Sequence, residues 1–589
     1  MNRLAFALTA LATGFFAGCS SGTSDPGTGT VSLVLTDSAT DELTQFEVDV
    51  DGIVFEKASG ATVSVLSRAT RVDFLQLESL AELVAAGSLE AGFYDRITVT
   101  LDFASARILI EGQTTPAAVL DQDGDPITGS YDVDVDLTTG ARPFVRAGRG
   151  HLLVLDLDLE QSVAVDAGAN TITFAPVWTV QTDPNGPDPI VTSGTLQSVD
   201  LANDVFYVER RAVDDTVVDV FAVRTAPATI YQLGGVARLG AFGFGSLVDH
   251  LGQRVYVQGT FDADDRAIDA VAVETGAGVP GNGQDWVYGH VVARTGPAGG
   301  DAQLTVIGRS VDVSTGTRTY NTLHTVDVSL ADTKVLRRGF GDTYGTDAIN
   351  VGQRVWIFGD LTGTSLDATS TDGVVRMLRT SIFGIANGPV VADTLTLDLT
   401  RFGLRDVAQF DFDVSGQVQA DPDAFTIDVA GLSTGAIAAD SRLRVFGFLS
   451  PVGASGPDAD ALSIVDRTTG AKLLWCQWAP PRTGVLDAEG QSGAVAIDVT
   501  QALIRVVADG FAPTTLTDAP TPTLVPLLTG GFYRIVQDGG VVVYTSFSEF
   551  RLGVAARTAN TAVARVSAFG TFDAGTQTFS ALTATVVLD

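Results

Sequence analysis

The chain has 589 residues, 45 % of them hydrophobic, and 70 Asp or Glu against 36 Lys or Arg give it a formal net charge of −34. This length predicts several domains, the apolar content excludes a wholly disordered chain, and the acidity argues against nucleic acid as a partner. The acids are mostly Asp, 58 against 12 Glu, and together with 63 Gly they favour turns and strands over helices.

The N-terminus carries an address signal. Arg3 precedes an apolar stretch from Leu4 to Phe16, which is too short to span a bilayer and is typical of a signal peptide over residues 1–18. It ends in Ala17-Gly18-Cys19, which resembles the lipobox of bacterial lipoproteins, although Phe16 stands where that family usually has Leu. The resemblance implies a diacylglycerol on the sulfur of Cys19 and an acyl chain such as palmitate on its amine. An ordinary secretory signal is the alternative.

The residues after Cys19 bear on where the anchor lies. Ser20 follows it, whereas the lipoprotein family's inner-membrane retention signal is an Asp, so the resemblance implies the outer membrane of a Gram-negative bacterium. Residues 19–30 form a polar tether. Cys476 is the only other cysteine, and we expect a packed, inert thiol at a domain junction, where Trp475 and Trp478 pin two domains together.

Residues 31–182 predict an N-terminal β-sandwich. Alternating apolar residues indicate strands at 31–35, 46–50, 93–99, 133–137 and 152–159, and one helix is expected at 75–86. Acidic residues at every second position of the later strands, Asp132, Asp134 and Asp136 and then Asp156, Asp158 and Glu160, predict solvated strand faces.

The same stretch is similar to an uncharacterised domain family that opens many bacterial envelope lipoproteins. The resemblance covers about 150 residues. It implies a fold and a location in the cell envelope but no biochemical activity. It rests on Leu35-Thr36-Asp37, Val72-Asp73-Phe74-Leu75-Gln76-Leu77, Ala91-Gly92-Phe93-Tyr94, and Leu155-Asp156-Leu157-Asp158 with Ser162-Val163.

A Pro-rich linker at 183–190 leads into a repeated pattern. Two landmarks recur in phase: a Gly that opens each unit, and an Arg that lies five residues before a second Gly near the end. We expect four repeats, at 191–275, 286–378, 381–467 and 480–589. The opening glycines are Gly194, Gly289, Gly384 and Gly484, and the closing pairs are Arg254 with Gly259, Arg354 with Gly359, Arg442 with Gly447, and Arg565 with Gly570.

The units resemble a short bacterial domain of unknown function that occurs in tandem on exported proteins. A closed barrel of five or six strands, broadly OB-like, fits the pattern because closure removes exposed sheet edges. The expected fold is therefore mainly β, an N-terminal β-sandwich followed by four tandem small β-barrels arranged as a rod.

Catalytic motifs are missing from the sequence. The four His show no zinc-ligand spacing, no nucleophile elbow or P-loop occurs, and the Gly276–Gly281 match to a dinucleotide fingerprint is a linker because Pro280 breaks the required helix. Asp121, Asp123 and Asp125 alternate in a turn and are candidate calcium ligands, although a solvated acidic turn is the simpler interpretation. No other cofactor is expected.

Tyr256, Trp356 and Phe446 recur near the closing strands of three units. They fit either core packing, which is favoured, or an outward face that stacks sugars or peptides. The sequence thus predicts a lipid-anchored envelope protein that is not an enzyme and has a binding or structural role, with a glycan or envelope protein as partner. The alternatives are an enzyme acting on an extracellular polymer and a periplasm-facing assembly accessory.

Overall fold

The computed structural model describes residues 27–37, 43–57, 59–66, 68–77, 81–121, 124–137, 142–183, 190–213, 216–414, 420–468, 472–490, 493–508, 514–527, 531–537 and 540–589. The signal peptide, Cys19 and most of the Pro-rich linker lie outside these residues. The fold is mainly β, as predicted, and its first strand begins at Thr28, so the end of the expected tether is strand.

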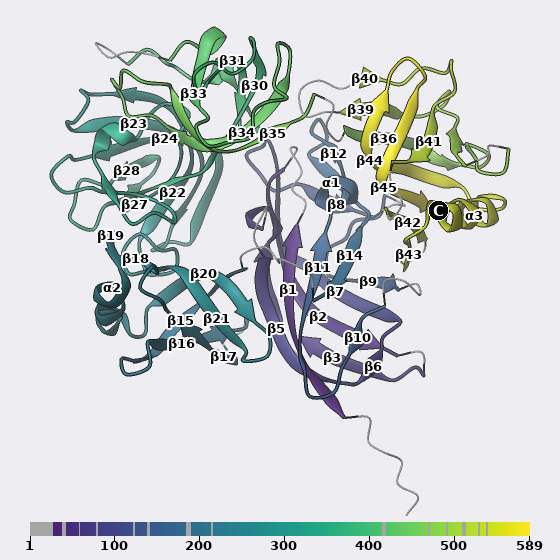
Figure 1. Cartoon of the computed structure of the whole chain (residues 1–589), viewed down its shortest axis with the longest axis horizontal. Coiled ribbons are helices and arrows are strands. Elements are labelled where there is room, and N and C mark those ends of the chain that lie inside the picture. Colours follow the sequence, from purple (N-terminus) through teal and green to yellow (C-terminus); the bar gives the residue numbers. More distant parts are fainter. Residues whose placement is uncertain are drawn as a thin grey trace, which may run out of the picture.

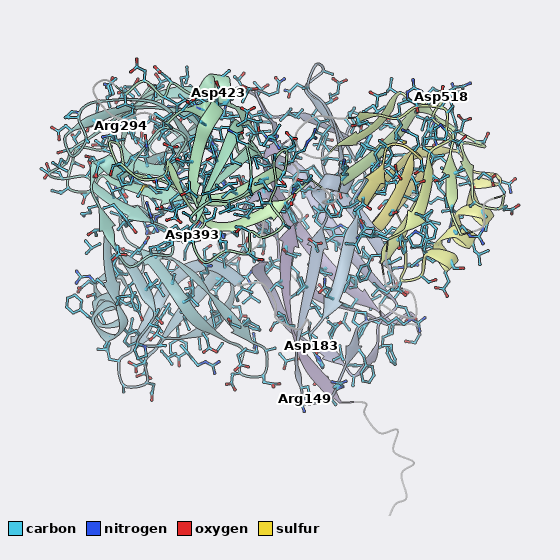
Figure 2. The ribbon with its side chains drawn as sticks, turned by 45° about the horizontal axis from the view of Figure 1, so that its top comes forward. Arg149, Asp183, Arg294, Asp393, Asp423 and Asp518 are labelled. Carbon is cyan, nitrogen blue, oxygen red and sulfur yellow. The ribbon has the colours of Figure 1, made fainter. Side chains whose placement is uncertain are left out.

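The N-terminal domain is a β-sandwich (Figure 1). Its two sheets pack around one apolar core, to which the inward residues of alternating strands such as Val31 and Leu33 contribute. Arg149 and Asp183 lie at the same end of this domain (Figure 2). One sheet contains β14 (Trp178–Thr182), β11 (Gly150–Leu157), β1 (Thr28–Asp37) and β5 (Ala81–Glu90); the other contains β3 (Thr62–Leu66), β4 (Thr70–Asp73), β2 (Leu43–Glu56), β7 (Arg96–Ile110) and β9 (Ser130–Asp136).

The helix expected at 75–86 is wrong. Within the described part of this stretch the chain forms the short 3-10 helix η1 (Phe74–Gln76) and then β5, which pairs with β1 from Glu82 to Glu90. The leucines that suggested one helical face are instead divided between cores: Leu77 packs inside the sandwich, and Leu83 packs against the first barrel. Sheet pairing thus outweighed a short local helical pattern.

Three stretches after the sandwich close into five-stranded barrels that share one strand order. Around each barrel the first strand pairs with the second, the second with the third, the third with the fifth, the fifth with the fourth, and the fourth with the first. The third and fifth strands are parallel. This is the order of an OB-like barrel. The first barrel consists of β15 (Ile190–Asp200), β16 (Val205–Arg211), β17 (Val217–Arg224), β21 (Ala267–Thr275) and β20 (Arg254–Asp262); the second of β22 (Asp285–Thr295), β23 (Ala302–Asp312), β24 (Thr317–Val328), β28 (Ser365–Asp367) and β27 (Arg354–Thr362); the third of β30 (Thr380–Ala386), β31 (Thr394–Phe402), β33 (Phe425–Asp428), β35 (Ala459–Asp466) and β34 (Arg442–Leu449).

The C-terminal barrel keeps this order with an interrupted first strand. It begins at Lys472, before the predicted start at 480, and the helix α3 (Phe547–Thr558), which the sequence analysis did not identify, precedes its fourth strand. The expected count of four repeats stays a prediction. The strands are β36 (Lys472–Arg482), β37 (Leu486–Asp487), β38 (Val495–Ile497), β41 (Thr523–Pro526), β45 (Thr578–Leu588) and β44 (Val563–Asp573).

The recurring closing glycines have a steric cause. At Gly259 the register of β20 against β21 shifts by a bulge, and a Cβ placed there would lie 2.2 Å from the carbonyl oxygen of Asp269. Gly570 repeats the arrangement, with 1.9 Å to the carbonyl oxygen of Ser580. Any side chain at these positions would force the two strands apart. The bulges that bend the barrel wall therefore need glycine there.

We expect Gly259→Ala to destabilise the protein by about 1–3 kcal/mol, because the added methyl group meets backbone that cannot rotate away. Thermal unfolding followed by circular dichroism measures the effect. Gly456→Ala is the matched control, since a Cβ there meets nothing within 4 Å. Equal melting temperatures for the two variants would contradict the steric explanation.

The barrels do not form a rod, so that expectation is wrong. The first, second and third barrels curve around the N-terminal sandwich, and the C-terminal barrel joins its other side (Figure 1). β15 extends one sandwich sheet through β5, and β43 (Gly540–Tyr544) extends the other through β9. Asp73 and Glu111 of the sandwich form ion pairs with Arg309 of the second barrel and Arg405 of the third, so the sandwich contacts every barrel.

Candidate functional site

A cavity of about 690 Å³ lies where the sandwich, the first barrel and the second barrel meet; we call it the central cavity. Its walls come from β2 and β4 of the sandwich, from β15 and β16, and from the second barrel around Trp286 and Trp356. Cavities between structural units are common ligand sites, and this volume falls within their usual range of about 300–1,000 Å³.

The charge of the central cavity is opposite to that of the whole chain. Seven arginines line it against four carboxylates, Glu47, Asp73, Glu82 and Glu209, in a protein whose net charge is −34. Because the surface is concave and partly desolvated, this local excess of positive charge produces a stronger positive potential than it would on an open surface. The arginines are Arg71, Arg210, Arg211, Arg254, Arg309, Arg318 and Arg338.

Most of these arginines hold the walls in place. Arg71 donates two hydrogen bonds of 2.7 Å to the carboxylate of Asp49, and Arg309 of the second barrel pairs with Asp73 of the sandwich at 3.3 Å. Arg210 donates to the carbonyl oxygen of Val84 at 2.6 Å, which ties the first barrel to β5. The contacts of Arg309 and Arg210 cross unit boundaries, and together with the Arg71–Asp49 pair they make the cavity a preformed feature.

Arg254 and Arg318 differ from the others. Within the described residues neither has a carboxylate at ion-pair distance; Arg254 donates to the hydroxyl of Ser193 at 2.8 Å and lies over the ring of Tyr256. Partial burial lowers the pKa of Arg318, and the like charge of Arg107 adds to the effect. Both guanidinium groups can accept an anion without losing an existing ion pair.

Aromatic rings form the rest of the lining. Val255 and Val257 fill the barrel core, which leaves half-buried Tyr256 on the cavity face, and Trp356 is placed in the same way in the second barrel. The favoured interpretation, that these two rings pack in the barrel cores, is therefore wrong. The rings of Trp286 and Trp356 lie edge to face with centroids 5.6 Å apart, and Nε1 of Trp356 donates to no described residue.

Phe446 does not reach this cavity. It is half-buried in the third barrel, where the guanidinium of Arg444 lies 4.6 Å from the centre of its ring. The aromatic position thus recurs along the sequence, but only the first and second barrels bring it to a common site.

Glu82 gives the central cavity a titrating group. Burial raises the pKa of its carboxyl to about 7, although the nearby Arg210 and Arg254 favour the charged form. Because the pKa is raised on folding, the folded protein retains a proton between the ordinary value of 4.5 and about 7 that the unfolded chain has lost. Stability is therefore lost as the pH rises through about 7.

We expect Glu82→Gln to flatten this dependence. The wild type should lose melting temperature between about pH 5 and pH 8 relative to the variant, because glutamine has no charged form to desolvate. Differential scanning fluorimetry across this range measures the difference. Parallel curves for the two proteins would show that Glu82 does not titrate there.

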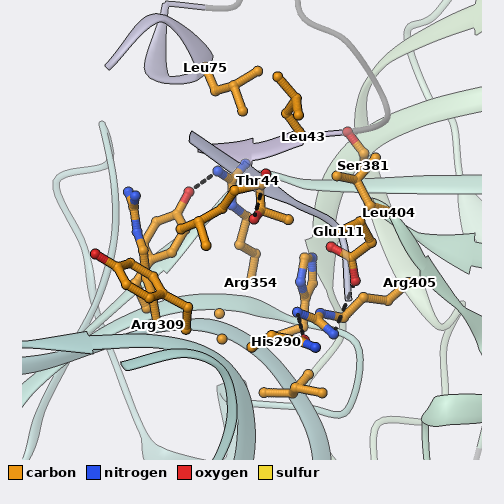
Figure 3. Close-up of a pocket in the computed structure, with 18 of the residues that line it drawn as sticks. Leu43, Thr44, Leu75, Glu111, His290, Arg309, Arg354, Ser381, Leu404 and Arg405 are labelled. Carbon is orange, nitrogen blue, oxygen red and sulfur yellow. Dashed lines mark hydrogen bonds and ion pairs between the residues drawn. The ribbon is translucent and has the colours of Figure 1, made fainter. Parts of the chain in front are cut away.

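A smaller cavity of about 150 Å³ shares Arg309 with the central cavity and lies between the sandwich and the second and third barrels (Figure 3). Glu111 of the sandwich pairs with Arg405 of the third barrel at 3.3 Å, and Arg354 donates to the hydroxyl of Tyr288. Burial lowers the pKa of His290 to about 3, so its ring is neutral at physiological pH.

The candidate calcium turn is only partly described. Asp123 lies outside the described residues, and the carboxylate of Asp121 accepts a hydrogen bond of 2.8 Å from the backbone N–H of Asp125. Among the residues that the structure describes, no three His, Cys, Asp or Glu side chains gather as metal ligands. Calcium binding by Asp121, Asp123 and Asp125 stays a prediction.

Cys476 is a packed thiol, as expected, but not at a domain junction. It lies fully buried on β36 in the core of the C-terminal barrel, beside Trp478, and burial raises its pKa to about 12. Only Trp475 faces the neighbouring unit: Arg565 lies over its ring and donates to the carbonyl oxygen of Ala175 in the sandwich.

The predicted solvated face after β11 is also partly wrong. The strand ends at Leu157, Asp158 is 8 % exposed, and the helix α1 (Leu159–Ser162) follows. Asp158 acts electrostatically on the buried Arg534 and Arg565 of the C-terminal barrel. On β9, Asp132 is exposed and Asp134 is half-buried, and both accept hydrogen bonds from threonines of β7.

Sequence reasoning identified Arg254, Tyr256 and Trp356 as recurring residues but not the central cavity. Its walls come from residues far apart in the chain; Arg309 and Asp73, for example, are 236 positions apart. No local pattern marks such a pair.

Comparison with known proteins adds one finding. Residues 28–176 match a family described as a domain of unknown function, DUF4382, which covers most of the sandwich. No curated protein matches the chain. Across the described residues, every helix is too short or too polar to pass through a bilayer.

Proposed function

We propose that this protein is a lipid-anchored, non-catalytic binding protein of the Gram-negative outer membrane. The observation that carries the binding role is the central cavity. It is preformed between three units, it is lined by aromatic rings and arginines, and two of those guanidinium groups form no ion pair with a carboxylate of the described residues.

The rigidity of the walls supports this role. Glu274 of the first barrel pairs with Arg376 of the second at 2.6 Å, and Ala237 of the first barrel packs against an apolar cluster of the second that consists of Leu336, Phe358 and Val374. A site held in its binding conformation avoids the entropic cost of ordering its walls when a ligand arrives.

The address rests on the sequence around Cys19. Metabolic labelling with an alkyne analogue of palmitate tests the anchor: label is expected on the wild type and not on Cys19→Ala. Protease treatment of intact cells, with a periplasmic protein as control, then tests the side of the membrane. Cleavage with the control intact indicates the cell surface, whereas protection until the outer membrane is opened favours the periplasm-facing accessory.

A binding experiment tests the role itself. Full-length protein in detergent is immobilised and exposed to envelope extract separated into polysaccharide and protein fractions. We expect retention from one fraction by the wild type and reduced retention by Trp356→Ala, with Phe242→Ala as control because Phe242 is 70 % exposed and does not line the cavity. Chemical change in a retained polymer would favour the enzyme instead.

A further inference from the structure

Two guanidinium groups of the central cavity are placed to receive negative charge. Arg254 on β20 and Arg318 on β24 both line it, and within the described residues neither forms an ion pair with a carboxylate, although Glu82 attracts Arg254 and Glu47 attracts Arg318 at longer range. Arginine is well suited to carboxylates because its planar fork can donate two parallel hydrogen bonds.

The cavity combines this charge with flat apolar surfaces. Tyr256, Trp286 and Trp356 line the same space. Aromatic rings bind the apolar faces of sugar rings. A ligand that has both sugar-ring faces and carboxylates would use the rings and the arginines together.

The charge of the rest of the protein further restricts the class of anionic ligand that can reach the central cavity. With a net charge of −34, the chain repels long polyanions such as nucleic acids from most approaches, whereas a short acidic chain interacts mainly with the cavity itself. The volume of about 690 Å³ also suits a short oligomer.

We infer that the central cavity binds an acidic oligosaccharide, with Arg254 and Arg318 contacting its carboxylates and Trp356 contacting a sugar face. This inference rests on the proposed binding function and names its ligand class. The carboxylates would replace water around Arg254 and Arg318 and would relieve the repulsion of Arg318 by Arg107.

Calorimetric titration of the full-length protein in neutral detergent tests the inference. The probe is trigalacturonate, and maltotriose is the uncharged control of the same length. We expect binding of trigalacturonate that weakens as salt is added, and weaker binding of maltotriose. The double variant Arg254→Gln/Arg318→Gln should lose affinity for trigalacturonate by about tenfold or more, since each lost contact is a charge-assisted hydrogen bond.

A second double variant controls for net charge. Arg96→Gln/Arg266→Gln removes two exposed arginines outside the cavity and should bind trigalacturonate as the wild type does. Equal losses in both double variants, equal binding of the two trisaccharides, or tighter binding of a short oligothymidylate would overturn the inference. If trigalacturonate fails to bind while the envelope extract is still retained through Trp356, the binding function stands and the acidic ligand is wrong.

Discussion

Replacing Glu274 by alanine is expected to lower the free energy of unfolding by about 3–5 kcal/mol, because it leaves a buried guanidinium without its counter-charge. Glu274 lies at the end of β21 and pairs with Arg376 at 2.6 Å and with Arg338 at 3.4 Å, both from the second barrel. The side chain of Arg376 is 1 % exposed, so water cannot replace the lost carboxylate. Urea unfolding followed by tryptophan fluorescence measures the loss.

An exposed ion-pair network provides the control. Arg224 bonds to Asp262, Asp265 and Asp269 at 2.7–2.8 Å, but its side chain is 33 % exposed. Arg224→Ala should therefore cost about 1 kcal/mol or less, despite removing more ion pairs. Equal losses in the two variants would contradict the importance that we assign to burial.

The Glu274–Arg376 ion pair also makes the stability of the protein depend on pH in the acid range. Burial by itself raises the pKa of Glu274, but Arg376 and Arg338 outweigh it and hold the pKa below its usual value of 4.5. Because the pKa is lowered on folding, the stabilisation by Glu274 is present above 4.5 and is lost as the pH falls through the lower value of the folded protein. Loosening of the joint between the first and second barrels should accordingly begin below about pH 4.5.

Replacing Trp178 by alanine is expected to cost about 3–5 kcal/mol, because the largest side chain would leave a cavity in a packed core. Trp178 on β14 is fully buried and lies edge to face with Phe74, at a centroid distance of 5.9 Å. The core around it also contains Val536 and Val541 of the C-terminal barrel. Limited proteolysis should therefore detect loosening at the C-terminal barrel as well as in the sandwich.

Phe242→Ala is the control for this variant, since its side chain is 70 % exposed and belongs to no core. Its urea midpoint should match that of the wild type. A Trp178→Ala protein in which only the sandwich becomes sensitive to protease would contradict the shared core.

Local patterns in the sequence determined much of the fold. Alternating apolar residues predicted strands of the sandwich, and the recurring Gly and Arg landmarks predicted repeated units. The closing glycines recur because a bulge such as that at Gly259 tolerates no side chain. These features depend on neighbours along one strand or hairpin, so they are visible in the sequence.

Other features depended on tertiary contacts. The segment 75–86 has a helical pattern, but the strand β1 supplies hydrogen bonds to its last part, which lies in β5. Asp158 looked solvated because its alternation with Asp156 was read as one strand face, whereas the chain turns after Leu157 and buries it against the C-terminal barrel.

The sequence by itself determined the acidity and most strands and predicted closed barrels, since each follows from nearby residues or from composition, and the lipid anchor at Cys19 stays a prediction. Only the tertiary structure decided that the barrels lie on two sides of the sandwich, and that Arg254, Arg318 and Trp356 share one cavity. The physical reason is that packing between units depends on the shapes and charges of whole surfaces, and these bring together residues that no spacing along the chain connects.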